Sequence, residues 1–229
     1  MTNDFHKFPR TPHLAVLADS VIRDDKVMSA SEREMFLRHE LVVEEKIDGA
    51  NLGISFDGEA RVRCQNRGSY LQYPYEGQWK KLSEWLAPKT DILFEKLADR
   101  YILFGEWCYA QHSVFYNRLP DWFLGFDIFD KESLKFLSCS RRDAIFRDIG
   151  ISGIPVIAKG HFTLSELKGM LSFSRLCDKP AEGIYLRFEQ EDWLKQRAKL
   201  VRPEFIQSVG DHWTRGGIKA NQLKRGAQI

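Results

Sequence analysis

A lysine followed closely by an acid and a glycine is the first feature of the sequence that could do chemistry. Lys46-Ile47-Asp48-Gly49 follows the apolar residues 41–45, and the glycine allows a tight turn where a ligand can approach the backbone. A lysine amine is a nucleophile only when neutral, and its ordinary pKa of about 10.4 keeps it protonated at pH 7. We expect neighbouring cations, among them Lys199 and Arg67, to favour the neutral form.

Charged residues also lie at the ends of other apolar stretches. These stretches contain Phe104-Gly105-Glu106, Phe126-Asp127-Ile128, Glu182-Gly183 and Arg197-Ala198-Lys199. If the ends converge, one lysine, several carboxylates and further cations form a single polar cleft. Carboxylate oxygens are ligands for Mg²⁺, and cations bind phosphate. The set therefore indicates phosphate chemistry.

These short segments together resemble the nucleotidyltransferase motifs of ATP-dependent RNA ligases, particularly the branch similar to RNA ligase 2. The resemblance assigns residues 46–51 to motif I, 65–67 to the arginine-bearing motif after it, 104–106 to motif III, 126–128 to motif IIIa, 182–183 to motif IV and 198–200 to motif V. Each match is short, but all six occur in the family's order between residue 41 and about residue 205.

The resemblance implies a fold and a reaction. The fold is an α+β ligase-type nucleotidyltransferase domain, with antiparallel sheets flanked by helices and the nucleotide cleft between the sheets. The reaction is the ATP-dependent joining of RNA 3′-OH and 5′-phosphate ends through a lysyl-AMP enzyme intermediate and an adenylylated RNA 5′ end. The cofactors implied are ATP and Mg²⁺, for which Mn²⁺ can substitute.

The same resemblance implies a role for each matched residue. The catalytic residues are Lys46, Lys199 and Arg67; the nucleotide-binding set is Glu45, Lys46, Glu106, Phe126, Glu182, Arg197 and Lys199; Asp127 and Glu182 bind metal; Asn51 and Arg67 contact RNA. Independently of the resemblance, Arg215 and Lys219 are expected to contact RNA, because cations near Trp213 are typical of single-strand binding. Phe126 would stack on adenine, Glu106 would contact the ribose and Lys199 would hold the α-phosphate. Motif V commonly carries two lysines two residues apart, and here Arg197 is preferred over Val201 as the partner of Lys199, with Arg202 in reserve.

Hydrophobic periodicity predicts the elements that position these residues. Strands are expected at 41–45, 51–56, 60–64, 101–104, 122–129, 183–188 and 198–201, and helices at 79–86, 92–97, 140–150, 163–176 and 203–210. The first three strands are expected to form an antiparallel meander through turns at Asp48-Gly49 and Asp57-Gly58. Thr163 with Glu166 three residues later is a capping box. Strands and helices without βαβ alternation favour an α+β fold.

Composition bounds the function classes. The 229 residues are 43% hydrophobic and 29% charged, which is typical of a soluble globular protein. Since no apolar run approaches the roughly 18–20 residues needed to span a bilayer, we expect no membrane partner and a cytoplasmic, intracellular location. The four cysteines and six histidines do not lie at zinc-ligand spacing.

Charge is distributed unevenly along the chain. Residues 193–229 carry a net charge of +6 and the preceding residues −4, an asymmetry that indicates a polyanionic partner. We expect one nucleotidyltransferase domain over residues 1–229, with a basic C-terminal segment at 193–229 and no separate C-terminal domain. RNA binding would then depend on the domain itself, on the basic segment, or on a partner such as an RNA end-healing or repair protein.

Two other classes of function remain open from the sequence. The same chemistry could serve DNA sealing or GTP-dependent capping, although the Gly-Ala-Asn of motif I favours RNA ligation. The chain could also be a non-catalytic RNA-binding module that retains the fold, against which Lys46, Glu106 and Glu182 argue.

Overall fold

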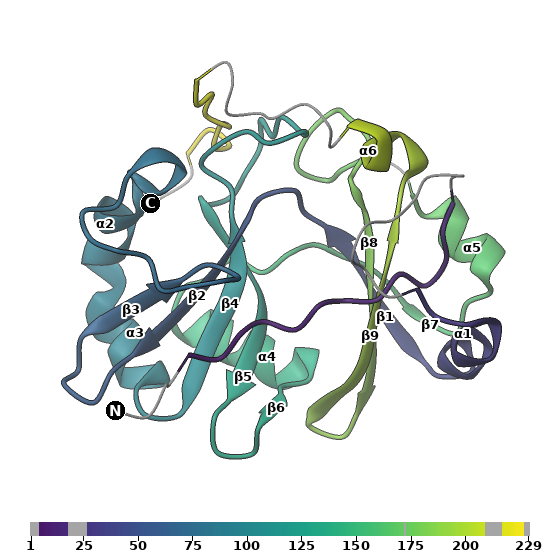
Figure 1. The fold of residues 1–229 in the computed structure, drawn as a ribbon, viewed down its shortest axis with the longest axis horizontal. Coiled ribbons are helices and arrows are strands. Elements are labelled where there is room, and N and C mark those ends of the chain that lie inside the picture. The colour runs from purple at the N-terminus through teal and green to yellow at the C-terminus, as the bar shows by residue number, and fades with distance from the viewer. Residues whose placement is uncertain (1–4, 18–26, 172, 209–216, 227–229) are drawn as a thin grey trace.

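Two antiparallel sheets face each other across the middle of the molecule (Figure 1). The computed structural model describes residues 5–17, 27–171, 173–208 and 217–226. The five-stranded sheet has the order β3-β2-β4-β5-β6 and the four-stranded sheet the order β7-β1-β8-β9. The expected α+β class with antiparallel sheets and flanking helices is confirmed.

The strands and helices have the following bounds. The strands are β1 (Leu41–Lys46), β2 (Ala50–Phe56), β3 (Val62–Gln65), β4 (Tyr101–Trp107), β5 (Phe123–Asp130), β6 (Lys135–Phe136), β7 (Val156–Gly160), β8 (Gly183–Gln190) and β9 (Trp193–Val201). The α-helices are α1 (Ala30–Leu37), α2 (Leu82–Leu86), α3 (Thr90–Leu97), α4 (Cys139–Asp148), α5 (Leu164–Gly169) and α6 (Pro203–Ser208), with short 3-10 turns η1 (Gly77–Trp79) and η2 (Ala87–Lys89). No helix of the described segments has the length and apolar character needed to cross a membrane.

Apolar side chains cover the outer face of each sheet. Figure 1 shows α2 and α3 beside the five-stranded sheet and α1 and α5 beside the four-stranded sheet. Trp85 of α2 packs in one cluster with β2 and β4, and Phe36 of α1 packs in another with β1 and β8. The inner faces hold a third, aromatic cluster that includes Phe104 and Phe126. Because the helices bury the outer faces, the inner faces are left for the site.

The predicted meander over residues 41–64 is wrong at its first turn. The β2–β3 hairpin is present, but β1 belongs to the other sheet. The Asp48-Gly49 turn therefore carries the chain between sheets. Its partners are remote in sequence: the Asp48 Oδ2 atom accepts hydrogen bonds from the backbone N–H groups of Ser113 and Val114 at 2.7 and 2.8 Å. Local periodicity cannot show such partners.

The helices follow the predictions at their starts more closely than at their ends. The Thr163–Glu166 capping box is confirmed, but α5 ends at Gly169 and not near residue 176. Beyond the helix, the Ser174 hydroxyl and the Arg175 N–H bond to the Glu45 carboxylate, which local periodicity cannot show. The predicted helix at 203–210 begins at Pro203 as expected, and residues 209 and 210 lie outside the described ranges. Neither α1 nor β7 was predicted.

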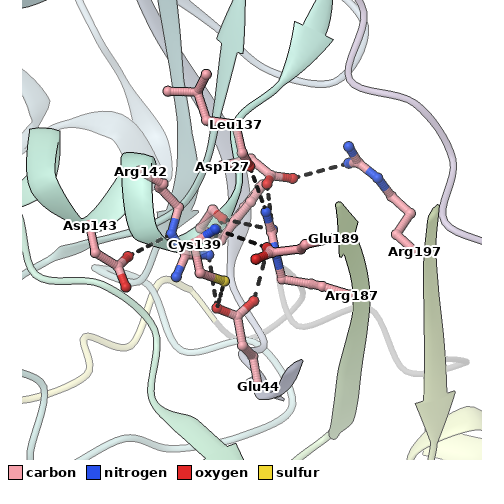
Figure 2. Close-up of polar contacts among 10 residues, drawn as sticks. Glu44, Asp127, Leu137, Cys139, Arg142, Asp143, Arg187, Glu189 and Arg197 are labelled. Carbon is pink, nitrogen blue, oxygen red and sulfur yellow. Dashed lines mark hydrogen bonds and ion pairs between the residues drawn. The ribbon is translucent and has the colours of Figure 1, made fainter. Parts of the chain in front are cut away.

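A buried network of charged side chains joins the two sheets (Figure 2). Arg187 of β8 is fully buried and pairs with Asp127 of β5, and its Nη1 atom lies 4.0 Å from Glu44 Oε2 of β1. Arg197 of β9 donates to the second Asp127 oxygen at 3.0 Å, and Arg142 of α4 lies 2.8 Å from Glu44 Oε1. Buried charges are tolerated only when paired, so this network fixes how the inner faces meet.

Replacing Arg187 with methionine is expected to lower the free energy of unfolding by about 3–5 kcal/mol, because Asp127 and Glu44 then lose a buried partner. Urea unfolding followed by circular dichroism measures the change. The matched control is Arg61→Met, which breaks ion pairs of an exposed side chain with Asp57 and Glu59 and should leave stability nearly unchanged. Equal losses in the two variants would contradict a bridging role for Arg187.

Candidate active site

Most residues predicted for the nucleotide line one cavity between the sheets. This first cavity has a volume of about 240 Å³ and is lined by Phe8, Thr11, Glu45, Lys46, Ile47, Asn51, Arg67, Glu106, Phe126, Ile154, Glu182, Tyr185 and Lys199. Residues separated by more than 150 positions in the sequence are thus brought together, as the order of the motifs predicted.

A second cavity adjoins the first at Lys46. It has a volume of about 420 Å³, and the two cavities share Lys46, Ile47, Asn51, Arg67, Glu106 and Glu182. The second cavity adds Asp48, Gly49, Ala50, Asn66, Gln78 and Trp79. The first cavity adds the apolar side chains of Phe8, Phe126 and Ile154 beside the polar ones of Thr11, Glu45, Tyr185 and Lys199. The side chain of Lys46 therefore lies where the two cavities meet.

Strand ends place the charged side chains of the first cavity. Lys46 is the last residue of β1 and pairs in register with Gly183, directly after Glu182. Glu106 comes from β4 in the opposite sheet, where it pairs with Asn51 of β2. Both sheets thus contribute charged side chains to the cavity. Because the chain crosses from one sheet to the other directly after β1, Lys46 lies where the two sheets meet.

Lys46 forms an ion pair with Glu182. Its Nζ atom lies 2.7 Å from Glu182 Oε2, and the two side chains are 23% and 9% exposed. Burial lowers the pKa of Lys46, but the charges of Glu182, Glu106 and Asp48 together outweigh it, and the pKa is raised. The expectation that neighbouring cations favour the neutral amine is therefore wrong for the protein without ligands, because carboxylates dominate the surroundings of the amine.

Three side chains that line the cavities carry buried polar atoms without a hydrogen-bond partner among the described residues. These are Glu106, through Oε2, Asn51, through both side-chain atoms, and Tyr185, through its hydroxyl. Burial raises the pKa of Glu106 to about 8, with the charge of Lys46 opposing the shift. Burial also raises the pKa of Glu182, again opposed by Lys46. Since buried polar groups are normally paired, Glu106 and Asn51 mark places where a ligand would bind.

Glu45 lines the first cavity but also holds a loop. Its carboxylate accepts hydrogen bonds from the Ser174 hydroxyl and from the Arg175 N–H, the latter at 2.9 Å. Burial raises the pKa of Glu45, and the bonds to Ser174 and Arg175 oppose the shift. The residue before the lysine thus fixes the segment that follows α5.

The structure does not bring Asp127 or Arg197 to either cavity. Arg197 shares the inner face of β9 with Lys199, as its two-residue spacing predicts, but its guanidinium lies over the Phe136 ring at 4.1 Å and pairs with Asp127. Both Asp127 oxygens are bound by arginines, Arg187 and Arg197. Asp127, which was expected to bind metal, and Arg197, which was expected to bind nucleotide, therefore form an ion pair with each other.

Three further cations were expected to bind RNA or nucleotide. Two of them lie away from the cavities, and the third lies outside the described residues. Arg215 lies outside the described ranges. Lys219 is exposed and lines neither cavity, and its carbonyl accepts a hydrogen bond from Gln111 N at 2.8 Å. Arg202, the reserve cation of motif V, bonds to the Ala181 carbonyl and lies 3.5 Å from Glu204 Oε2.

Several lining residues were not identified from the sequence. Tyr185 pairs in register with Lys199, and its position two residues after Gly183 on the same face of β8 could have indicated it. Gln78 lies in the short turn η1, and its Oε1 atom is 2.9 Å from His112 Nε2. Phe8 and Thr11 come from the N-terminal segment. No local signal places these last residues at the site.

Replacing Glu106 with glutamine is expected to stabilise the protein more at pH 9 than at pH 5. A carboxyl whose pKa rises to about 8 on folding favours the folded state in its protonated form, and this stability is lost as the pH rises through about 8. Glutamine cannot ionise, so the gain at pH 9 should be on the order of 5 kcal/mol. Urea unfolding at both pH values, without nucleotide or metal, measures it.

Glu84→Gln is the control, since Glu84 is exposed and pairs only with exposed Lys81 among the described residues. A gain for Glu106→Gln that is the same at pH 5 and pH 9 would contradict the raised pKa of Glu106.

Comparisons with known proteins agree with the fold. The family model described as RNA ligase matches residues 39–201. An RNA ligase mutant of Naegleria gruberi with ATP and Mn superposes with a TM-score of 0.61 at 16% identity, covering 76% of this chain and 53% of that chain. The same organism's ligase with PPi gives 0.61 at 14% identity, over 89% of this chain and 57% of that chain.

These structural matches concern the fold, and this chain spans little more than half the length of the ligases it matches. A direct comparison with curated proteins finds no match. The family model covers well over half of the sequence, in the segment that contains both cavities except for the N-terminal contribution. On this evidence the chain belongs to the RNA ligase family.

Proposed function

We propose that this chain is an ATP-dependent RNA ligase that joins RNA 3′-OH and 5′-phosphate ends through a lysyl-AMP intermediate on Lys46. The observation that carries the proposal is the position of Lys46 at the junction of two cavities. An amine there can take a nucleotidyl group from a ligand in one cavity and pass it to a ligand in the other. Covalent catalysis of this kind divides one difficult transfer into two easier ones.

The first cavity suits the nucleotide. Phe126 and Ile154 offer apolar surface for a purine ring, and Lys199 and Arg67 supply cations for its phosphates. Glu106 can accept hydrogen bonds from ribose hydroxyls through its unpaired oxygen. The assignment of ATP agrees with the ATP-bound ligase from Naegleria gruberi that shares the fold.

A divalent cation fits the carboxylates of the site. No group of three metal-ligating side chains occurs among the described residues, and Mg²⁺ is commonly held by only one or two carboxylates together with substrate phosphates. Glu182, which lines both cavities, would hold it together with phosphate oxygens. When bound, the cation would offset the charge of the departing pyrophosphate and compete with the Lys46 ammonium for the same carboxylate.

Lys46 must lose a proton before it attacks the α-phosphate. Glu182 Oε2 already accepts a hydrogen bond from Lys46 Nζ at 2.7 Å, so it is placed to receive that proton. Because burial raises the pKa of Glu182, its carboxylate is a stronger base than an exposed glutamate. In-line attack then expels pyrophosphate and leaves AMP on the lysine nitrogen.

The second cavity suits the RNA ends. Asn51, Asn66, Arg67 and Gln78 provide amide and guanidinium donors for phosphate and sugar oxygens. The RNA 5′-phosphate would take AMP from Lys46 there, and a 3′-OH would then attack the activated end and release AMP. Arg215 and Lys219, with RNA end-healing or repair proteins, remain proposed contributors to RNA binding outside the cavities.

Replacing Lys46 with alanine is expected to abolish formation of the covalent adduct. Intact-mass spectrometry after incubation with ATP and Mg²⁺ should show one added AMP in the wild type and none in Lys46→Ala. Lys168→Ala is the control, because Lys168 is an exposed lysine of α5 and should keep the adduct. Undiminished labelling of Lys46→Ala would overturn the assignment of the nucleophile.

The same assay separates the alternative functions. Labelling by GTP in preference to ATP would indicate capping, and gel assays with RNA and DNA ends distinguish the polymer that is sealed. If the wild type forms no adduct with either Mg²⁺ or Mn²⁺, the chain is not a covalent nucleotidyltransferase and a non-catalytic RNA-binding role takes its place.

A further inference from the structure

The N-terminal strap, residues 5–14, crosses from the five-stranded sheet to the four-stranded sheet (Figure 1). At the five-stranded sheet, the ring of His6 stacks on Phe129 with a centroid distance of 3.6 Å and an interplanar angle of 16°. The His6 carbonyl accepts a hydrogen bond from Gln65 Nε2 at 2.8 Å. This end of the strap is therefore attached to β3 and β5.

The other end of the strap bonds to both backbone groups of Lys199, its N–H and its carbonyl. Lys199 N donates to the Pro12 carbonyl at 2.9 Å, and Leu14 N donates to the Lys199 carbonyl at 2.8 Å. The strap thus extends the four-stranded sheet beside β9 at the residue whose amine is proposed to hold the α-phosphate. These bonds restrict the rotation of β9 and so the direction in which the Lys199 side chain leaves the strand.

Between its two ends, the strap contributes a wall to the first cavity. Phe8 is 3% exposed and meets the ring of Phe126 edge-on at 5.2 Å and that of Phe104 at 5.0 Å. Phe8 and Thr11 line the first cavity. Edge-to-face contacts fix the orientation of an aromatic ring, so Phe8 holds Phe126, the ring expected to stack on the base.

The strap also lies between the first cavity and a third cavity. Pro9, Arg10 and Pro12 line this third cavity of about 480 Å³, which does not include Lys46. The match to the RNA ligase family model begins at residue 39, so the strap lies outside the matched segment.

We propose that the strap is a working part of the nucleotide site: Phe8 closes the base-binding end and holds Phe126, and the backbone bonds to Lys199 position that lysine toward the phosphates. The inference rests on the proposed function, because it takes the ligand of the first cavity to be a purine nucleotide. Phe8 contacts the base, and Pro12 and Leu14 act as positioning residues.

The first test measures lysyl-AMP formation by the full chain over a range of ATP concentrations. Phe8→Ala should raise KM for ATP about tenfold, the loss expected for one aromatic wall, with a smaller effect on kcat. Phe8→Leu should recover part of the loss. Lys7→Ala is the control, since exposed Lys7 neighbours Phe8 and lines none of the three cavities; its KM should stay within about twofold of wild type.

The second test does not depend on catalysis. ATP added to the Lys46→Ala variant should slow amide hydrogen exchange in the strap and in β9 more than in β7, which lies at the far edge of the same sheet. Circular dichroism and thermal unfolding establish that each variant is folded.

Either of two results would overturn the inference: a folded Phe8→Ala variant with an unchanged KM for ATP, or exchange that slows no more in the strap than in β7. Absence of lysyl-AMP in the wild type would instead count against the proposed function. The exchange measurement still decides the role of the strap in that case, because it reports ATP binding alone.

Discussion

The ion pair between Lys46 and Glu182 is the interaction on which the account of the site depends. A partly buried ammonium is stable only beside compensating charge, and here three carboxylates outweigh the effect of burial on the Lys46 pKa. The lysine is therefore held as a charged, well-placed side chain until ligands change its surroundings. This arrangement requires acids from both sheets at one point, so it depends on how the sheets are joined.

Two clusters of charge lie between the sheets. In the network around Arg187 both oxygens of Asp127 are bound by arginines (Figure 2), whereas Glu44 bonds to Arg142 through Oε1 and its buried Oε2 lies 4.0 Å from Arg187 without a hydrogen bond. Around Lys46, Glu106 keeps a buried oxygen without a partner among the described residues. An unpaired buried acid costs stability that a bound ligand can recover. The arginine network thus joins the two sheets, while Glu106 remains open to a ligand in the cavity.

The sequence predicted the parts that depend on local pattern or on the order of the motifs. The Thr163–Glu166 capping box is local and was found, and the convergence of Lys46, Glu106 and Glu182 followed from the family resemblance. The assignment of the Asp48-Gly49 turn to a hairpin failed because its partners lie more than 60 residues away. Asp127 was expected to bind metal because a sequence shows a carboxylate but not the arginines that occupy it. The place of the strap at the site was not predicted, since its contacts with Phe126 and Lys199 join residues far apart in the sequence.

The most direct test is the pKa of the Lys46 amine, measured by ¹⁵N NMR of the lysine side chain in the protein without nucleotide or metal. We expect a pKa above the ordinary lysine value, and we expect this pKa to fall when Glu182 is replaced by glutamine and when Mg²⁺ is added. A pKa below the ordinary value in the free protein would show that cations, and not the carboxylates, control the nucleophile, and would contradict the account.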